Sequence, residues 1–102
     1  MICTTVVYPT APDTRFDRSY YLQRHMPMVS RRWSPFGLKQ TQVIEGTKGL
    51  DGSKPACYMI ALLYWDSVEG VQRALAEAPE VMGDIANYTN VQPVVYVGEV
   101  VM

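Results

Sequence analysis

The chemistry that this sequence can support centres on its single histidine, His25. An imidazole titrates near pH 6.5, so it can take up and return a proton at neutral pH, and such general acid–base help is worth about 10²–10⁴ in rate. The histidine lies within the segment FDRSYYLQRHMPMV, residues 16–29, where apolar side chains recur every three or four residues. This spacing predicts an amphipathic helix with the imidazole in its apolar stripe. Two roles follow for His25: a general base that faces a pocket, or a core histidine bonded to a backbone carbonyl.

Other chemistries find little support in the residue types. No serine, aspartate or cysteine stands at a spacing that indicates a nucleophilic triad with His25. One histidine without a flanking carboxylate motif falls short of the three protein ligands of a catalytic zinc, and 102 residues leave little room to enclose a haem. Cys3 and Cys57 are too far apart for a Cys-x-x-Cys motif, and we expect both to be buried as small hydrophobic residues. The sequence therefore predicts neither a metal site nor a cofactor.

Composition and length restrict the class of protein. The apolar fraction of 48% and the charged fraction of 19% are those of an ordinary globular protein, and we expect a single domain over residues 1–102. The net charge is −1 and no basic stripe is present, which argues against a nucleic-acid partner. The sequence has no apolar run of the roughly 20 residues that a membrane span needs, and no secretory signal, so we expect no membrane partner and a cytoplasmic location.

The residues around His25 also predict where its helix begins and bends. Asp17 is a good N-cap, and Phe16 before it can pack on Tyr21 as a hydrophobic staple. Pro27 has no backbone donor and clashes with the preceding turn, so we expect the helix to kink or restart near Met26. The kink is thus predicted beside the histidine.

The other elements follow from period-two and period-three-to-four patterns along the chain. A second helix is predicted after Asp66, which forms a capping-box pattern with Glu69, and Pro79 should end it. Residues 80–86 can form one more short helical turn, and the glycine-rich segment 46–55 reads as a hairpin loop. Strands are predicted over Ile2–Tyr8, Leu38–Glu45, Ala56–Trp65 and Tyr88–Val101.

The element order strand, helix, strand, strand, helix, strand predicts a ferredoxin-like α+β fold. In this fold a four-stranded antiparallel sheet carries both helices on one face, and its other face is usually polar. In the segment ACYMIALLYW, residues 56–65, both alternating sets of side chains are apolar instead. Because a monomer rarely exposes such a surface, we expect a second copy of the chain to pack against it as a homodimer.

Several segments together carry a resemblance to a known family. The string FDRSYYLQRHMPMV, followed by Trp33 and Gly37, by YMIALLYWDSVE and by NYTNVQPVVYVGEV, resembles the EthD family, named for ethyl tert-butyl ether degradation. That family belongs to the dimeric α+β barrel superfamily. The resemblance implies that the sheets of a homodimer close into a barrel, and that a pocket between each sheet and its helices faces His25. The superfamily spans cofactor-free monooxygenases, lactone isomerases, decarboxylases, dehydratases and haem enzymes, so the resemblance implies the fold more firmly than the activity.

We expect aromatic and apolar side chains to line this pocket. Arg24, beside His25, either pairs with an anionic group of the substrate or is a solvated helix position. For any single tyrosine or methionine, core filling is the alternative role. The candidate walls are Tyr20 or Tyr21, Met28, Trp33, Phe36 and, from the inward residues of the third strand, Tyr64.

Two functions remain open at this stage. In the first, the protein is a small cofactor-independent enzyme, an oxidoreductase or monooxygenase, in which His25 deprotonates an apolar or aromatic, quinol-like or enolic molecule. The carbanion would react with dioxygen or rearrange, as in a lyase or isomerase of the same superfamily. In the second, the protein is a non-catalytic accessory module that binds a small apolar molecule.

Overall fold

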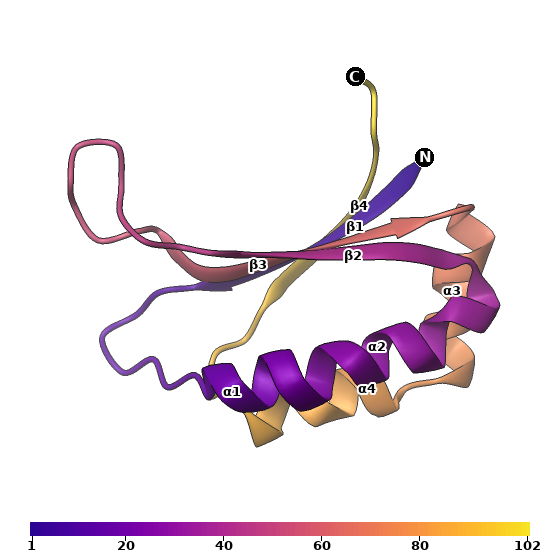
Figure 1. Cartoon of the computed structure of the whole chain (residues 1–102), viewed down its shortest axis with the longest axis horizontal. Helices are drawn as coiled ribbons and strands as arrows, with labels where there is room; N and C mark the ends of the chain where they lie inside the picture. Colours follow the sequence, from indigo (N-terminus) through magenta and orange to yellow (C-terminus); the bar gives the residue numbers. More distant parts are fainter.

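The computed structural model describes residues 1–102, and its helices and strands form two layers (Figure 1). All the helices lie on one face of the sheet, and the other face is uncovered (Figure 1). The strands are β1 (Ile2–Pro9), β2 (Leu38–Glu45), β3 (Cys57–Trp65) and β4 (Val94–Glu99). The helical segments are α1 (Arg18–Tyr20), the π-helical turn η1 (Tyr21–His25), α2 (Met26–Trp33), the 3₁₀ turn η2 (Ser34–Phe36), α3 (Val68–Glu77), α4 (Glu80–Gly83) and the 3₁₀ turn η3 (Asp84–Asn87).

The sheet has the order β2-β3-β1-β4, and all its neighbouring strands are antiparallel. This order and the helices on one face confirm the predicted ferredoxin-like α+β fold. None of the helices is long and apolar enough to cross a membrane.

The helix that carries the histidine runs through α1, η1 and α2. It begins as predicted at Asp17, whose Oδ1 accepts a hydrogen bond from the Tyr20 amide at 3.1 Å. The expected kink takes the form of the wide turn η1, in which the Met26 amide bonds to the Tyr21 carbonyl five residues earlier. Pro27 explains this turn, because its ring lacks an N–H and would clash with a carbonyl of a regular α-helix. Within the wide turn, Tyr21 and His25 are the buried side chains.

The second long helix begins one residue later than the capping-box pattern predicts. Ser67 is the N-cap of α3, and its Oγ accepts a hydrogen bond from the Gly70 amide at 3.2 Å. Asp66 is instead held outside the helix, because its amide donates to the Gly37 carbonyl and its carboxylate lies 3.3 Å from Lys39 Nζ. The predicted Asp66–Glu69 capping box is therefore wrong, whereas the predicted stop before Pro79 is confirmed.

The last strand is shorter than the predicted Tyr88–Val101. The segment 88–93 does not join the sheet, since it is tied to the loop before α1: the Asp17 amide donates to the Tyr88 carbonyl at 2.7 Å, and Phe16 forms an isolated bridge with Thr89. Pro93 cannot donate to a sheet, and β4 begins directly after it. These backbone contacts place Tyr88 beside the first helix.

The two faces of the sheet differ in what covers them. On β3, alternate residues are buried under the helices, namely Met59, Ala61, Leu63 and Trp65. Directly paired residues of antiparallel strands share a face, and the register places one apolar row across all four strands of the uncovered face: Ile44, Ile60, Val7 and Val94. The neighbouring rows on this face also contain polar residues, such as Gln42 and Thr5.

Both cysteines are free thiols and are half-buried rather than fully buried. They lie on the neighbouring strands β1 and β3, but Cys3 pairs with Tyr64 and Cys57 pairs with Pro9. The two thiols are thus near opposite ends of the strand pair and too far apart for a disulfide.

Candidate functional site

His25 is buried, with 4% of its surface exposed, and both of its ring nitrogens face polar side chains. Its Nδ1 lies 3.0 Å from Oδ2 of Asp84 in η3, and its Nε2 lies 3.3 Å from the hydroxyl of Tyr88. An ionised carboxylate can only accept hydrogen bonds, so Nδ1 carries the ring proton and donates it to Asp84. The Nε2 lone pair is then free to accept the Tyr88 hydroxyl proton, which makes Nε2 the basic atom of the site.

Asp84 is itself held by several donors. Its Oδ1 accepts hydrogen bonds from the Tyr20 hydroxyl at 2.7 Å and from Asn87 Nδ2 at 2.8 Å. Burial alone would raise the pKa of this carboxyl, but the hydrogen bonds from Asn87, Tyr20 and His25 outweigh it and lower the pKa below its usual range. Asp84 is therefore ionised at neutral pH and fixes the orientation of the imidazole.

Burial lowers the pKa of His25 below its ordinary value of 6.5, and the hydrogen bond and charge of Asp84 offset only part of this effect. The imidazole is consequently neutral at pH 7. A neutral imidazole beside a carboxylate can accept a proton and become an ion-paired imidazolium.

Two tyrosines extend the chain of hydrogen bonds beyond His25. The hydroxyls of Tyr8 and Tyr88 lie 2.5 Å apart. Because the Tyr88 proton points to His25, Tyr8 donates to Tyr88, and the chain runs from Tyr8 through Tyr88 and His25 to Asp84. Burial raises the pKa of Tyr8 to about 12 and also raises the pKa of Tyr88, so both phenols keep their protons at neutral pH.

Tyr21 is the one buried side chain at this site without a polar partner. It is fully buried, and its ring stacks on the imidazole of His25 with centroids 5.6 Å apart and planes 15° apart. Its hydroxyl is buried and makes no hydrogen bond. Burial raises the pKa of this phenol as well, so it keeps its proton at neutral pH. The hydroxyl is therefore a hydrogen-bond donor without an acceptor.

A small hollow between the sheet and the helices lies beside these groups. Its volume is about 20 Å³, and hydrophobic side chains form most of its wall. The lining residues with polar side-chain atoms are Tyr8, Tyr21, His25 and Trp33, and the indole N–H of Trp33 donates to the Ala78 carbonyl. The remaining lining residues are Val6, Met26, Val29, Ala61, Leu63, Val81, Met82 and Ile85.

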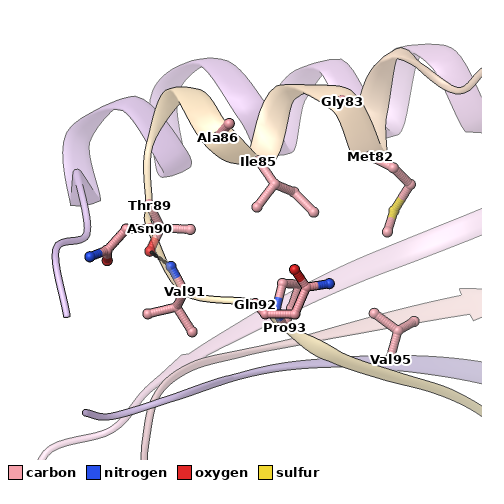
Figure 2. Close-up of a pocket in the computed structure, with 10 residues that line it drawn as sticks. All are labelled: Met82, Gly83, Ile85, Ala86, Thr89, Asn90, Val91, Gln92, Pro93 and Val95. Atoms are coloured by element: carbon pink, nitrogen blue, oxygen red, sulfur yellow. Dashed lines mark hydrogen bonds between the residues drawn. The ribbon is translucent and has the colours of Figure 1, made fainter. Parts of the chain in front are cut away.

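A larger, open cleft of about 520 Å³ lies next to this hollow, between the α4–η3 segment and the chain that leads into β4. In Figure 2, Met82 and Ile85 point from the helical segment toward the β4 side, where Val95 points back at them. Met82 and Ile85 line both the open cleft and the hollow beside His25. These two side chains thus stand between solvent and the buried histidine.

Three of the predicted site residues meet at the hollow. His25, Tyr21 and Trp33 all line it. Tyr20 lies beside the site in a different role, since its hydroxyl holds Asp84.

The other predicted residues lie elsewhere. Arg24 is exposed and forms no ion pair, which fits the solvated helix position. Met28 packs on the outside of the core, and Phe36 lies under the guanidinium of Arg73, 5.5 Å from its ring centroid. The placement of Tyr64 among the inward residues is wrong, because the inward set of β3 is the odd-numbered one and the Tyr64 hydroxyl bonds Gln42 of the neighbouring strand β2.

Asp84, Tyr88 and Tyr8 are not identified as site residues from the sequence. Asp84 comes 59 positions after His25, inside a short helical turn that periodicity alone marks as surface. A signal was available only for Tyr8, because the period-two pattern of β1 places it on the same inward face as Val6. No group of three or more His, Cys, Asp or Glu side chains in the chain is arranged to hold a metal ion.

Comparisons with known proteins place this chain in a family. No family model matches the sequence, and no curated protein matches it. A solved EthD-like protein from Ralstonia eutropha JMP134 shares 38% identity and a TM-score of 0.90, over 99% of this chain and 92% of that one. An EthD-family protein from Bacillus halodurans C-125 shares 19% identity with a TM-score of 0.78, over 98% of each chain. A dimeric ferredoxin-like protein from an uncultured marine organism shares 13% identity with a TM-score of 0.54, over 100% of this chain and 96% of that one.

The two matches at 19% and 13% identity show the fold alone. The first match combines 38% identity with coverage of nearly all of both chains. The resemblance seen in the sequence is therefore confirmed, and the chain belongs to the EthD family.

Proposed function

We propose that the protein is a cofactor-independent enzyme in which His25 acts as the general base on a small apolar or aromatic molecule. The observation that carries the proposal is the neutral, buried imidazole of His25, held by the ionised Asp84 beside an apolar hollow. Perturbed titratable groups of this kind gather at functional sites. A carbon acid activated by loss of a proton either rearranges or reacts with dioxygen. Oxidation of a CH₂ group to C=O by dioxygen releases one water, so a monooxygenase reaction of this type needs no further reductant.

The hydrogen-bond chain suggests how a substrate proton reaches His25. Nε2 faces Tyr88, whereas Tyr8 lines the hollow. A substrate proton moves to the Tyr8 oxygen, the Tyr8 proton moves to Tyr88, and the Tyr88 proton moves to Nε2. The result is an imidazolium paired with Asp84, with both phenols neutral again, as their raised pKa values require.

The proposal can be tested by hydrogen–deuterium exchange at a carbon acid. The probe is 2-tetralone, an aromatic ketone with acidic α-hydrogens, in buffered D₂O with NMR detection. We expect the wild-type protein to accelerate the exchange, and His25→Gln to reduce it to the buffer rate, since general-base help is worth about 10²–10⁴. Tyr88→Phe should lower the exchange rate by at least about tenfold, because it interrupts the hydrogen-bond chain between Tyr8 and His25.

Arg24→Ala is the matched control, since Arg24 is adjacent to His25 but exposed. It should exchange 2-tetralone at the wild-type rate. Wild-type exchange that survives His25→Gln would contradict the proposed function.

A binding protein is the second candidate, and one observation favours it: both ring nitrogens of His25 already have partners within the chain. In that case the wild-type protein would bind 2-tetralone without accelerating its exchange, and His25→Gln would bind it equally well.

We further propose that the protein is a homodimer that pairs through the uncovered face of its sheet. The apolar row of Ile44, Ile60, Val7 and Val94 supports this, because Ile44 and Val94 are about half exposed at 49% and 56%. A structural neighbour with the same fold is described as dimeric. The pairing would leave the site of each copy on the helical side of its own sheet.

A further inference from the structure

We propose that the hydroxyl of Tyr21 binds the carbonyl oxygen of an enolisable ketone and stabilises the enolate that forms when the base removes the α-proton. This inference rests on the proposed function and deepens it, because it assigns a substrate class and a second catalytic group.

The first support is the unpaired state of this hydroxyl. Tyr21 is 0% exposed, and its Oη is the one buried side-chain nitrogen or oxygen in the chain without a hydrogen-bond partner. Leaving a buried hydroxyl unpaired destabilises a fold, and native proteins rarely do so. A ligand oxygen at this position would supply the missing acceptor.

The second support is the character of the hollow that Tyr21 lines. The other lining residues with polar side-chain atoms already have partners within the chain: Tyr8 bonds Tyr88, His25 bonds Asp84 and Tyr88, and Trp33 bonds the Ala78 carbonyl. A volume of about 20 Å³ is enough for one water, which takes roughly 10–15 Å³ but also needs two to four polar partners. Apart from the Tyr21 donor and the acceptor oxygen of Tyr8, the wall is mostly apolar, so the hollow suits an oxygen atom that belongs to an apolar molecule better than it suits a water.

The third support is the position of the Tyr21 hydroxyl relative to the hydrogen-bond chain of Tyr8, Tyr88 and His25. The Tyr21 ring lies 5.6 Å from the imidazole of His25 and 5.7 Å from the ring of Tyr8, measured between centroids. Tyr21, which would donate the hydrogen bond, and Tyr8, which would accept the substrate proton, therefore line the same small hollow. A ketone whose oxygen meets Tyr21 presents its α-carbon to this neighbourhood, since the two atoms are separated by a single carbon.

The chemistry balances without any further reactant. The α-proton passes through Tyr8 and Tyr88 to His25, the C–H bond electrons form the new C=C bond, and the carbonyl electrons move to the oxygen. Burial raises the pKa of Tyr21, so its proton stays on the phenol and stabilises the enolate oxygen as a hydrogen-bond donor. A preorganised donor of this kind in a dry site is typically worth about 10²–10³ in kcat.

The shape of the site limits the rest of the substrate. The hollow has room for the oxygen end of a ligand, whereas the cleft of about 520 Å³ beyond Met82 and Ile85 is large enough for a ring system. In Figure 2, Met82 and Ile85 face Val95 across this cleft, and Asn90 and Gln92 add polar groups to its lining. The geometry thus favours a flat, apolar ketone over a sugar or a polyanion.

The experiment compares Tyr21→Phe with wild type in two measurements. In the first, 2-naphthol is bound as a planar analogue of the enol, with naphthalene as the ligand that lacks the oxygen. Wild type should prefer 2-naphthol by about tenfold or more, and Tyr21→Phe should bind both ligands equally. In the second, exchange of 2-tetralone should fall about 10²–10³-fold in Tyr21→Phe. Tyr58→Phe is the control, because Tyr58 lies outside the hollow.

The outcomes separate this inference from the proposed function. If His25→Gln abolishes exchange while Tyr21→Phe exchanges at the wild-type rate, the role of Tyr21 is ruled out and the role of His25 as the base is retained. If His25→Gln retains exchange, the proposed function fails, and the naphthol preference still decides whether Tyr21 binds an oxygen. Thermal unfolding tests whether the hydroxyl serves only a buried water: Tyr21→Phe should melt at the wild-type temperature or above, and a clear decrease would overturn the inference.

Discussion

At the residue scale, the site depends on where each proton resides. Asp84 determines that Nδ1 of His25 carries the ring proton, and burial keeps the imidazole neutral. The three phenols around it stay protonated for the same reason. His25 was predicted from sequence because a titratable residue in an apolar stripe is conspicuous. Its partner Asp84 was not, since a contact across 59 residues leaves no local pattern.

The lowered pKa of His25 predicts a pH dependence of stability. Between the folded pKa and the unfolded value near 6.5, the unfolded chain binds a proton that the folded chain does not. This contribution to the free energy of unfolding is present above pH 6.5 and is lost as the pH falls through the folded pKa. The lowered pKa of Asp84 acts in a separate window below about 3.8.

Urea denaturation of wild type and His25→Gln between pH 5 and pH 7.5 measures this effect. The wild-type free energy of unfolding should decrease toward pH 5, and the slope should be smaller in the variant. Equal slopes in the two proteins would show that the histidine titrates alike in both states.

At the element scale, local signals predicted the helix starts near Asp17 and the stop before Pro79, because caps and prolines act within one turn. They failed where a tertiary contact decided the boundary. Segment 88–93 belongs to the predicted last strand, but hydrogen bonds to the loop before α1 keep it out of the sheet. Asp66 could cap α3, but its amide is bonded to Gly37.

The start of α3 offers a stability prediction. A Cβ at Gly70 would lie 2.1 Å from the Phe36 carbonyl oxygen, so η2 and α3 can pack this closely only with glycine there. Gly70→Ala should destabilise the fold by about 1–3 kcal/mol, since both elements must move apart.

Gly83→Ala is the matched control. A Cβ at Gly83 meets nothing within 4 Å, so this change should leave the stability equal or raise it by about 0.4–1 kcal/mol. Urea midpoints at one protein concentration compare the two variants. A Gly70→Ala protein as stable as Gly83→Ala would mean that the close contact is not rigid.

At the scale of the whole molecule, the sheet has an inward face under the helices and an uncovered face that carries an apolar row. The inward face builds the core and the site, and the uncovered face is free to pair with a second copy. Alternation in the sequence predicted both faces, although it assigned Tyr64 to the wrong one. The hollow itself was beyond sequence reasoning, because its walls come from β1, β3, η1, α2 and the α4–η3 segment together.

A charge on the uncovered face tests the pairing. Leu62→Glu, on β3 between Thr5 and Gln42, should convert the dimer to a monomer in analytical ultracentrifugation, because burying an unpaired carboxylate in an interface is strongly unfavourable. Gln23→Glu adds the same charge on an exposed helix position and should remain dimeric. A wild-type monomer, or a dimer that tolerates Leu62→Glu, would rule out this interface.

An NMR titration of ¹⁵N-labelled histidine tests whether His25 is the neutral base of the site. The chain has one histidine, so each signal belongs to His25. We expect a neutral ring at pH 7 with the proton on Nδ1 and a pKa below 6.5. In Asp84→Asn the pKa should decrease further, because the carboxylate that favours the imidazolium is gone. A ring already charged at pH 7, or a proton on Nε2, would contradict the role of His25 as the neutral base.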